Sequence, residues 1–320
     1  MNQASPKIDH RFSFSGNGSQ LFGIYFLNVL FLILTLGLYW PWARANMLRF
    51  MYGNTEFGGN RFEFTGTGQE MFKGFLKGMA ILITLYAIYI AAILSGNLIL
   101  LFAGIIVFLF GLACLIPLAI HGALRYRLAK TTWRGIQFGY RGDLKELISI
   151  CVKGVLLSIL TLGIYGAWFQ VEMRQYIFKH IRWGSLSMRF KGKGSELFVL
   201  LLVGYLLTII TLGIYLFWFM RDMYRYYINN MVIDQEDKES EFNTSISATD
   251  VFIIFMASYF GILFTLGLGT PWVICFITQK VMSTLTVSGD VDFDTIYQTE
   301  TNYTDATGDD LADMLDIGII

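Results

Sequence analysis

The sequence predicts an all-α integral membrane protein: about six transmembrane or hydrophobic helices in five internal repeats, with short β-hairpin-like connections. Its 320 residues are 55% hydrophobic and only 15% charged, whereas a soluble domain carries about a quarter charged residues. Six apolar stretches approach the roughly 20 residues that cross a bilayer as a helix. They are residues 21–42, 75–94, 98–120, 147–169, 197–220 and 251–277. A soluble protein with six buried helices is the alternative.

A short phrase near the end of the apolar stretches gives the repeats. Thr-Leu-Gly occurs four times, each time 19 residues after an anchor residue. The four threonines are Thr35, Thr161, Thr211 and Thr265, and their anchors are Gly16, Gly142, Gly192 and Ile246. A fifth copy begins at the anchor Gly66, is 26 residues longer, and has Gly111-Leu112-Ala113 in place of the phrase.

These offsets divide a single membrane domain, 1–320, into five units. The units are approximately residues 11–61, 62–137, 138–187, 188–241 and 242–293. Residues 294–320 follow them as an acidic C-terminal tail, which we expect to be solvated because acidic runs repel one another and attract water. The alternative is that its small apolar face, Leu311, Met314 and Leu315, docks on the basic hairpins of the same chain or on a partner.

Each unit opens with the signature of a helix start. A short polar residue followed three positions later by Glu, Gln or Asp is a capping pattern, because the two side chains satisfy free N–H groups of the first turn. The pattern occurs as Asn17/Gln20, Thr67/Glu70, Asp143/Glu146 and Ser247/Asp250, while Lys193/Glu196 keeps only its second half. The apolar stretch then predicts a helix of about five turns.

Thr-Leu-Gly predicts the interruption of that helix. In the last unit Thr270-Pro271 follows it, which is typical of the first residues of a new helix. A basic amphipathic stretch comes next, and a hairpin pattern with central glycines, such as residues 54–66, completes the unit.

Tryptophans recur 26 residues after the anchors. They are Trp42, Trp168, Trp218 and Trp272. With their neighbouring tyrosines they suit the aromatic belt at a membrane interface. We interpret them as membrane anchors, so membrane lipids are the first partners that the sequence predicts.

The segment from Phe14 to Gly66 contains the string FxGxGxxLF, then TLGxYxPW, then NTxFxGxxFxFTG. It resembles the YjgN-like family of bacterial inner-membrane proteins, a family of unknown function, and the resemblance extends over nearly the whole chain. It implies a multi-pass protein of the inner (plasma) membrane of a Gram-negative bacterium. It brings no established substrate or catalytic residue to this chain.

Patterns for catalysis, cofactors or metals are missing from the sequence. The histidines His10, His121 and His180 have no Cys, Asp or Glu at metal-ligand spacing, and no Walker loop or nucleophile-elbow motif occurs. We therefore expect no enzyme, no cofactor and no metal. The formal net charge of zero gives no bias toward nucleic acid.

Polar residues inside apolar stretches are costly in a membrane and often functional. Lys77 and Lys153 both lie eleven residues after their anchors, and Asn28 lies one position beyond the matching place in the first unit. These three form the candidate polar membrane site, which would bind an anionic group or neutralise a carboxylate. The alternative is that the lysines snorkel to the interface.

Arginines also recur at matched offsets. Arg49, Arg125 and Arg225 are the candidate interfacial contacts for lipid headgroups or other anions. The sharper hypothesis is an anion-coordinating ring where the repeats converge.

Two membrane arrangements are open. In the favoured one, successive β-hairpins lie on alternating faces, and nearly equal numbers of Lys and Arg on the two faces leave the positive-inside rule undecided. In the other, each Thr-Leu-Gly is the tip of a re-entrant helical hairpin, all β-hairpins share the cytoplasmic face, and the second hairpin has its tip at Ser95-Gly96-Asn97. The second arrangement places Arg44, Arg221 and Asp222 deep in the membrane, at a cost. Both put the two termini on one side of the membrane, which we expect to be the cytoplasm because of the uncleaved polar N-terminus and the acidic tail.

The leading functional hypothesis is transport or binding of a small anionic solute or a lipid, because internal repeats and broken helices build the site of many transporters. A non-catalytic membrane scaffold or assembly factor is the alternative, since the apolar stretches lack the acids that are typical of ion-coupled pumps. A homo-oligomer and another membrane protein both remain open as partners.

Overall fold

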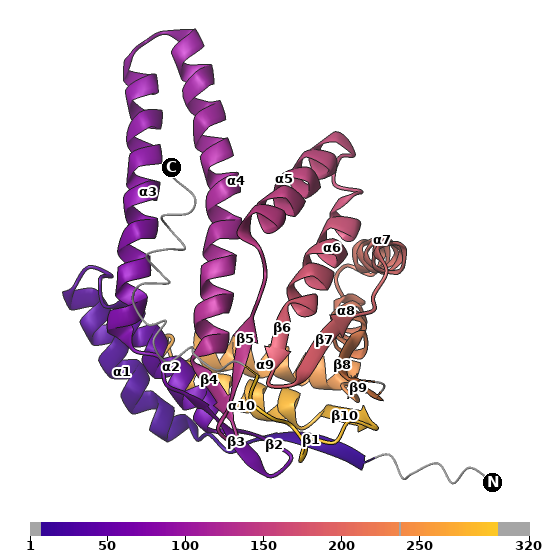
Figure 1. The fold of residues 1–320 in the computed structure, drawn as a ribbon. Helices are drawn as coiled ribbons and strands as arrows, with labels where there is room; N and C mark the ends of the chain where they lie inside the picture. The colour runs from indigo at the N-terminus through magenta and orange to yellow at the C-terminus, as the bar shows by residue number, and fades with distance from the viewer. Residues whose placement is uncertain (1–7, 237, 300–320) are drawn as a thin grey trace.

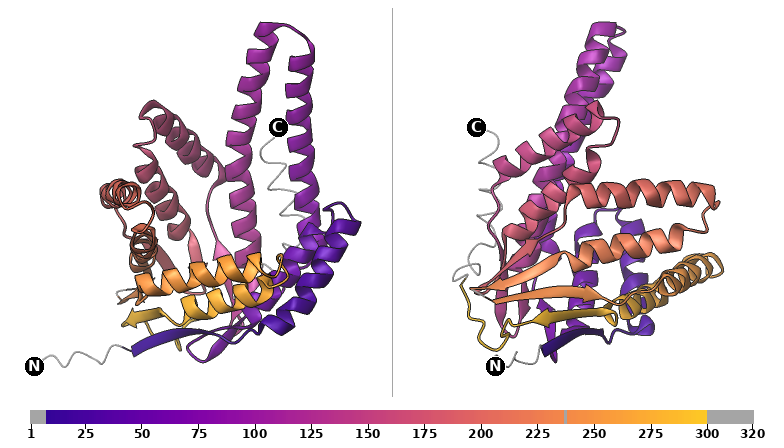
Figure 2. Two further views of the ribbon diagram at one scale, coloured as in Figure 1. Left: turned by 180° about the vertical axis from the view of Figure 1, so that it is seen from behind. Right: turned by 90° about the vertical axis from the view of Figure 1, so that its right-hand side faces the viewer.

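Ten strands and ten helices make up the described part of the chain, residues 8–236 and 238–299. In this computed structural model the strands close into one antiparallel barrel in the order β1-β10-β9-β8-β7-β6-β5-β4-β3-β2. The helices pair into five hairpins that fan out from the barrel (Figures 1 and 2).

The strands are β1 Ile8–Phe14, β2 Thr55–Phe57, β3 Asn60–Phe64, β4 Thr131–Trp133, β5 Ile136–Tyr140, β6 Ile181–Trp183, β7 Leu186–Phe190, β8 Met231–Gln235, β9 Lys238–Thr244 and β10 Leu285–Gly289. The helices are α1 Gly18–Leu34, α2 Trp40–Gly53, α3 Gly68–Leu94, α4 Leu98–Ala129, α5 Leu144–Leu160, α6 Gly166–Lys179, α7 Gly194–Ile210, α8 Leu216–Asn229, α9 Ala248–Leu263 and α10 Thr270–Met282.

The order strand, helix, helix, strand occurs five times. The two strands of each unit pair with each other, as Phe14 does with Thr55 in β1 and β2, and a helical hairpin connects them at that end. Short turns connect one unit to the next at the opposite end, as between Phe57 and Asn60. We call these two ends of the barrel the helix rim and the turn rim. Pairing of β1 with β10 closes the circle.

Apolar side chains from all ten strands fill the barrel. Eight strands contribute buried residues, and Phe12 of β1 and Phe62 of β3 pack against them. The eight are Phe57, Trp133, Phe138, Trp183, Leu186, Ile233, Phe242 and Val287. The indole N–H of Trp133 donates to the carbonyl oxygens of Phe57 and Asn60, at 3.2 and 3.3 Å. The barrel is a packed core, as expected when aromatic rings of about 150–250 Å² face inward.

The segment that follows β10 belongs to the same core. Val291, Phe293 and Ile296 are buried in it, and the ring of Phe293 meets that of His10 edge-on, with 4.8 Å between centroids. Asp294 pairs with Arg134 at the turn rim, at 2.5 Å. At the start of the tail Asp294 is exposed, as a solvated tail predicts, whereas Ile296 enters the core, so this part docks on its own chain, as the alternative predicts. Residues 300–320 lie outside the described residues.

Thr-Leu-Gly ends the first helix in four of the hairpins. The hydroxyl of Thr35 donates to the carbonyl of Phe31 at 2.6 Å and accepts the N–H of Tyr39 at 3.0 Å. Leu36 and Gly37 then take positive φ values of 49° and 93°, as in a Schellman ending with leucine at its first left-handed position. The same pair of threonine bonds recurs at Thr161, Thr211 and Thr265.

The second helix of each unit packs on the first helix of the next, and α10 packs on α1, so the hairpins also form a closed ring. The contact requires glycine. A Cβ on Gly68 would lie 2.4 Å from the Trp42 ring, closer than side chains approach each other. The same contact joins Gly194 to Trp168 and Gly18 to Trp272.

Three features of the fold predicted from the sequence are wrong. The chain is not all-α. Each hairpin-like connection between units supplies two β-strands, and the ten strands pair into a closed barrel. The count of about six transmembrane or hydrophobic helices is too low, because the predicted interruption at Thr-Leu-Gly is confirmed and divides four of the six apolar stretches between two helices each. Only α3 and α4 are long and apolar enough to span a membrane among the described residues, while α1, α7 and α9 are shorter apolar helices.

The favoured alternating arrangement is the third error. One barrel holds all ten strands, and every helical hairpin leaves from its helix rim, so successive β-hairpins share one side. The geometry is that of the re-entrant alternative, including its tip at Ser95-Gly96-Asn97, since α3 ends at Leu94 and α4 begins at Leu98.

The predicted helix starts are confirmed. Asn17, Thr67, Asp143, Lys193 and Ser247 are the N-caps of the five first helices, and full capping boxes form at Thr67 and Ser247. In the fifth unit the Lys280 ammonium and the Ser247 cap lower the pKa of Asp250 to about 2.

Replacing Gly68 by Ala is expected to lower the free energy of unfolding by about 1–3 kcal/mol, because the new methyl group overlaps the Trp42 ring. Thermal unfolding in detergent measures the change. Gly23→Ala in α1 is the matched control, since nothing lies within 4 Å of its Cβ and alanine favours helix. Equal melting temperatures for the two variants would contradict the packing described here.

Single cysteines at Arg61 and Lys191 are expected to react with a membrane-impermeant maleimide from the same side of the membrane, because Arg61 lies in β3, Lys191 directly follows β7 and both are exposed. Labelling is compared in spheroplasts and inside-out vesicles of a variant that lacks the native cysteines. A cysteine at the tip residue Leu212 is the negative control. Reaction of Arg61→Cys and Lys191→Cys from opposite sides would contradict the one-sided arrangement.

Candidate functional site

Four hairpin tips present leucine at the end farthest from the barrel. Leu36, Leu162, Leu212 and Leu266 are 93–95% exposed, and each adopts a positive φ of 49–52°. Leucine in this conformation costs about 1–2 kcal/mol, and its exposure is unfavourable in water. Insertion into lipid would bury each side chain and return about 1.5–3 kcal/mol. The tips therefore have the chemistry of membrane-inserting elements.

The second hairpin is longer than the others. Its helices α3 and α4 contain 27 and 32 residues, which corresponds to about 40 and 48 Å of helix, against a hydrocarbon core of about 30 Å. Their most apolar windows are only 0% and 6% buried within the described chain, unlike the mostly buried core helices of a soluble fold.

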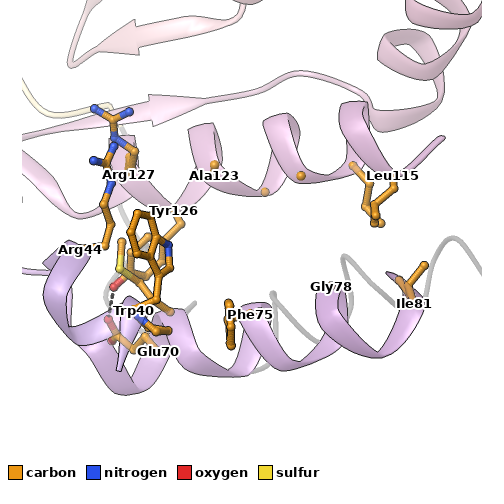
Figure 3. Close-up of a pocket in the computed structure, with 16 residues that line it drawn as sticks. Trp40, Arg44, Glu70, Phe75, Gly78, Ile81, Leu115, Ala123, Tyr126 and Arg127 are labelled. Carbon is orange, nitrogen blue, oxygen red and sulfur yellow. Dashed lines mark hydrogen bonds between the residues drawn. The ribbon is translucent and has the colours of Figure 1, made fainter. Parts of the chain in front are cut away.

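A groove of about 470 Å³ lies between α2, α3 and α4 (Figure 3). Small residues open it: Gly74 and Gly78 on α3 face Ala119, Gly122 and Ala123 on α4. Larger apolar residues complete the walls and the far end. These are Met71, Phe75, Ile81, Leu115 and Leu118. The volume lies within the range of about 300–1,000 Å³ that is usual for ligand pockets.

The other end of the groove is cationic. Arg44 of α2 and Arg127 of α4 extend beside each other there, near Trp40 and Tyr126 (Figure 3), and the two positive charges repel each other. Arg127 donates through Nη2 to the hydroxyl of Tyr52 at 3.0 Å, whereas its buried Nε has no hydrogen-bond partner. Within residues 8–236 and 238–299, neither guanidinium forms an ion pair with a carboxylate.

The carboxylate that lines this end is already engaged. Glu70 pairs with Lys130 at 3.0 Å, accepts the hydroxyl of Tyr126 at 2.7 Å and accepts the N–H of Thr67 at 3.1 Å as part of the capping box. Its negative charge is therefore compensated by Lys130. The arginine pair keeps a net positive charge at the base of an apolar groove.

The predicted polar site does not assemble. Asn28 is buried between α1 and α2, where it donates to the carbonyl of Ala43 at 3.4 Å and accepts from Asn46 at 3.2 Å. Lys153 is exposed and lies 3.9 Å from Glu172 within its own hairpin, and Lys77 is exposed on α3. In the part of the chain that the structure describes, no hydrogen bond or ion pair links Asn28, Lys77 and Lys153. Their joint function stays a prediction.

The repeated arginines connect neighbouring units. Arg49 donates to the carbonyl of Gly66, the next anchor, at 3.1 Å, and Arg225 donates to that of Ile246 at 3.0 and 2.6 Å. Gln175 makes the matching bond to Gly192 at 3.1 Å, and Arg125 is also engaged. Lipid contact by Arg49, Arg125 and Arg225 stays a prediction.

The tryptophans lie at contacts between units as well. Trp42, Trp168 and Trp272 cover anchor-region glycines, and Trp218 stacks on Tyr215 with 6.3 Å between centroids. Trp218 and Trp272 remain 41% and 45% exposed, so part of each ring is free to meet lipid. Membrane anchoring by the four tryptophans stays a prediction.

The profile of a family of bacterial proteins of unknown function, DUF898, matches residues 9–188, 185–239 and 229–314. The chain belongs to this family. The resemblance to YjgN-like proteins is also confirmed, because distant homologues of this DUF898 chain carry that name.

Three of these relatives are each named inner membrane protein YjgN. The one from Escherichia coli O157:H7 is 33% identical over 136 residues, which is 42% of this chain and 32% of the relative. That from strain K12 is 32% identical over the same shares of both chains. The Salmonella typhimurium protein is 25% identical over 185 residues, 53% of this chain and 45% of the relative. The chain spans less than half the length of the curated relatives it matches, and no solved structure matches it.

The groove of this DUF898 chain was not predicted from its sequence. Arg44 was considered there only as a charge whose burial in the membrane is costly. One signal was available. Gly74 and Gly78 are four residues apart on one helix, and Ala119 and Ala123 are four apart on the next. Small residues at this spacing are typical of close contacts between membrane helices.

Replacing Leu212 by Asn is expected to lower the melting temperature in lipid nanodiscs. Asn tolerates the left-handed backbone better than Leu, so the change should be neutral or favourable in water, whereas in lipid it removes about 1–3 kcal/mol of apolar burial. Glu236→Asn is the control, because Glu236 has a φ of 52° in a turn of the barrel and should tolerate Asn. A stabilised Leu212→Asn variant would contradict tip insertion.

Proposed function

We propose that this protein is an inner-membrane binding protein that holds a lipid-like amphiphile in the groove between α2, α3 and α4. The shape of the groove carries the proposal: its long walls are apolar, its base is polar, and it lies along the hairpin that is long enough to span a bilayer. A molecule with an acyl chain and a polar head matches this division. The role is binding, and transport if the bound molecule moves along the hairpin, without catalysis.

The proposed orientation places the barrel in the cytoplasm. The five hairpin tips, residues 35–39, 95–97, 161–165, 211–215 and 265–269, contain no Lys or Arg. With all hairpins leaving one rim, the tips lack basic residues while the barrel carries them, so the positive-inside rule favours a cytoplasmic barrel. Lys77, Lys153, Arg44 and Arg221 lie within the hairpin helices and are the cost of this orientation. The four short hairpins would enter the bilayer from that face, and both termini would lie on it.

The packed barrel argues against a solute path along its axis. Movement through it would require displacement of Phe57, Trp133 and Trp183, which touch one another at its centre, and of Phe293 below them. The groove lies outside the barrel and needs no such displacement, which favours an amphiphile over a water-soluble solute.

Filling the groove tests the proposal. Gly78→Leu and Ala119→Leu are expected to weaken amphiphile binding by about tenfold or more, because the added side chains occupy the space of an acyl chain. Native mass spectrometry of the purified protein with a dioleoyl phospholipid measures the bound fraction. Nothing lies within 4 Å of a Cβ on Gly78, so the fold should tolerate its replacement.

Gly23→Leu is the matched control, since Gly23 lies on α1 away from the groove and has open space around its Cβ. It should bind as the parent protein does. Unchanged binding by both groove variants would contradict the proposal and favour the scaffold alternative.

A further inference from the structure

One pair of facing positions recurs at the contacts between units. Arg44 lies 28 residues after its anchor Gly16. Arg127 belongs to the next unit and lies 35 residues after its anchor once the 26 inserted residues are left out. The second helix of each unit packs against the following hairpin, so positions 28 and 35 are equivalent places on the two sides of each unit boundary.

The other boundaries fill these positions with compatible side chains. Between the third and fourth units the hydroxyl of Tyr227 donates to Gln170 at 2.9 Å. The remaining pairs are apolar: Ile120 with Ile177, Met220 with Val281, and Ile274 with Met51. Ile120 and Ile177 pack on one buried cluster, and Ile274 and Met51 on another.

The boundary between the first and second units departs from this rule. Both positions are arginine, and two guanidinium groups side by side repel each other, most strongly where water is partly excluded. Glu70 is bound by Lys130 and Tyr126, so no described carboxylate offsets the repulsion. The buried, unpartnered Nε of Arg127 adds an unsatisfied donor. An anion at this place would resolve both costs.

We propose that Arg44 and Arg127 bind the phosphate group of an acidic phospholipid whose acyl chains lie along the walls of the groove. Two guanidinium forks match the oxygens of a phosphate, and such charge-assisted bonds are short and strong. The apolar walls begin next to the arginines (Figure 3), so a headgroup and its chains would fit in one continuous site. The inference rests on the proposed function and specifies its ligand.

The test replaces the two arginines by the compatible pair of residues found at another unit boundary. The double variant Arg44→Gln, Arg127→Tyr copies Gln170 and Tyr227, which already meet in this fold. Binding of dioleoyl phosphatidylglycerol and of dioleoyl phosphatidylcholine is measured by native mass spectrometry for both proteins. The parent protein should prefer the anionic lipid by about tenfold or more. The double variant should lose the preference, because its affinity for phosphatidylglycerol falls strongly, whereas that for phosphatidylcholine falls less, since the choline cation already offsets the charge of that phosphate and the apolar walls are unchanged.

Melting temperature without lipid gives an independent measurement. The double variant should melt no lower than the parent protein, since a like-charge contact is removed. Arg44→Gln alone serves if the double variant does not fold, and it too should lose the preference for phosphatidylglycerol. Inorganic phosphate should raise the melting temperature of the parent protein less than phosphatidylglycerol does.

Each contrary outcome is specific. Absence of a preference in the parent protein, or its persistence in the variants, would overturn the assignment of the anion site while leaving amphiphile binding intact. An equal effect of inorganic phosphate would mean that a free anion is the ligand and would overturn the lipid assignment. If the groove-filled variants alone lose binding to both lipids, the result still supports the proposed function.

Discussion

Pairing of β1 with β10 is the constraint on which the rest of the architecture depends. A closed barrel leaves no free strand edge, so each unit has to return its chain to the rim that it left. The two helices of a unit must therefore run out and back as a pair. The break between them has to lie at the far end, and all five breaks have to lie on the same side. That all five hairpins point to one side of the barrel follows from strand pairing, without any further instruction in the apolar segments.

Ring closure also explains the unusual local chemistry of the units. Neighbouring hairpins approach so closely at the helix rim that glycines are required there: a Cβ on Gly18 would lie 2.4 Å from the ring of Trp272, and one on Gly68 would lie 2.4 Å from that of Trp42. The tips face the opposite problem, because none of the described residues covers their leucines, which are 93–95% exposed. In the proposed orientation, lipid would offset the strain and the exposure of leucine at these left-handed positions.

Local features were predictable from the sequence, and long-range pairing was not. The caps at Asn17 and Thr67 and the tip at residues 95–97 follow from short motifs whose physics acts within one or two turns of helix. The barrel depends on strands of three to seven residues that pair across whole units. An alternation of apolar and polar residues as short as this does not specify which other strand it pairs with. Arg44 and Arg127 likewise come together only because hairpins of consecutive units overlap, an overlap that no periodicity within either helix encodes.

Departures from the repeat coincide in one region of the ring. The inserted residues lengthen only the hairpin α3–α4, the groove opens between that hairpin and α2, and the like-charged pair lies at its base. A ring of equal units would gain stability from an apolar or hydrogen-bonded pair here, as at the boundary of Gln170 and Tyr227. Stability alone gives no reason for two arginines, a long exposed hairpin and a stripe of small residues at the same boundary. Their coincidence is accounted for if this boundary binds a ligand and the other four hold the ring together.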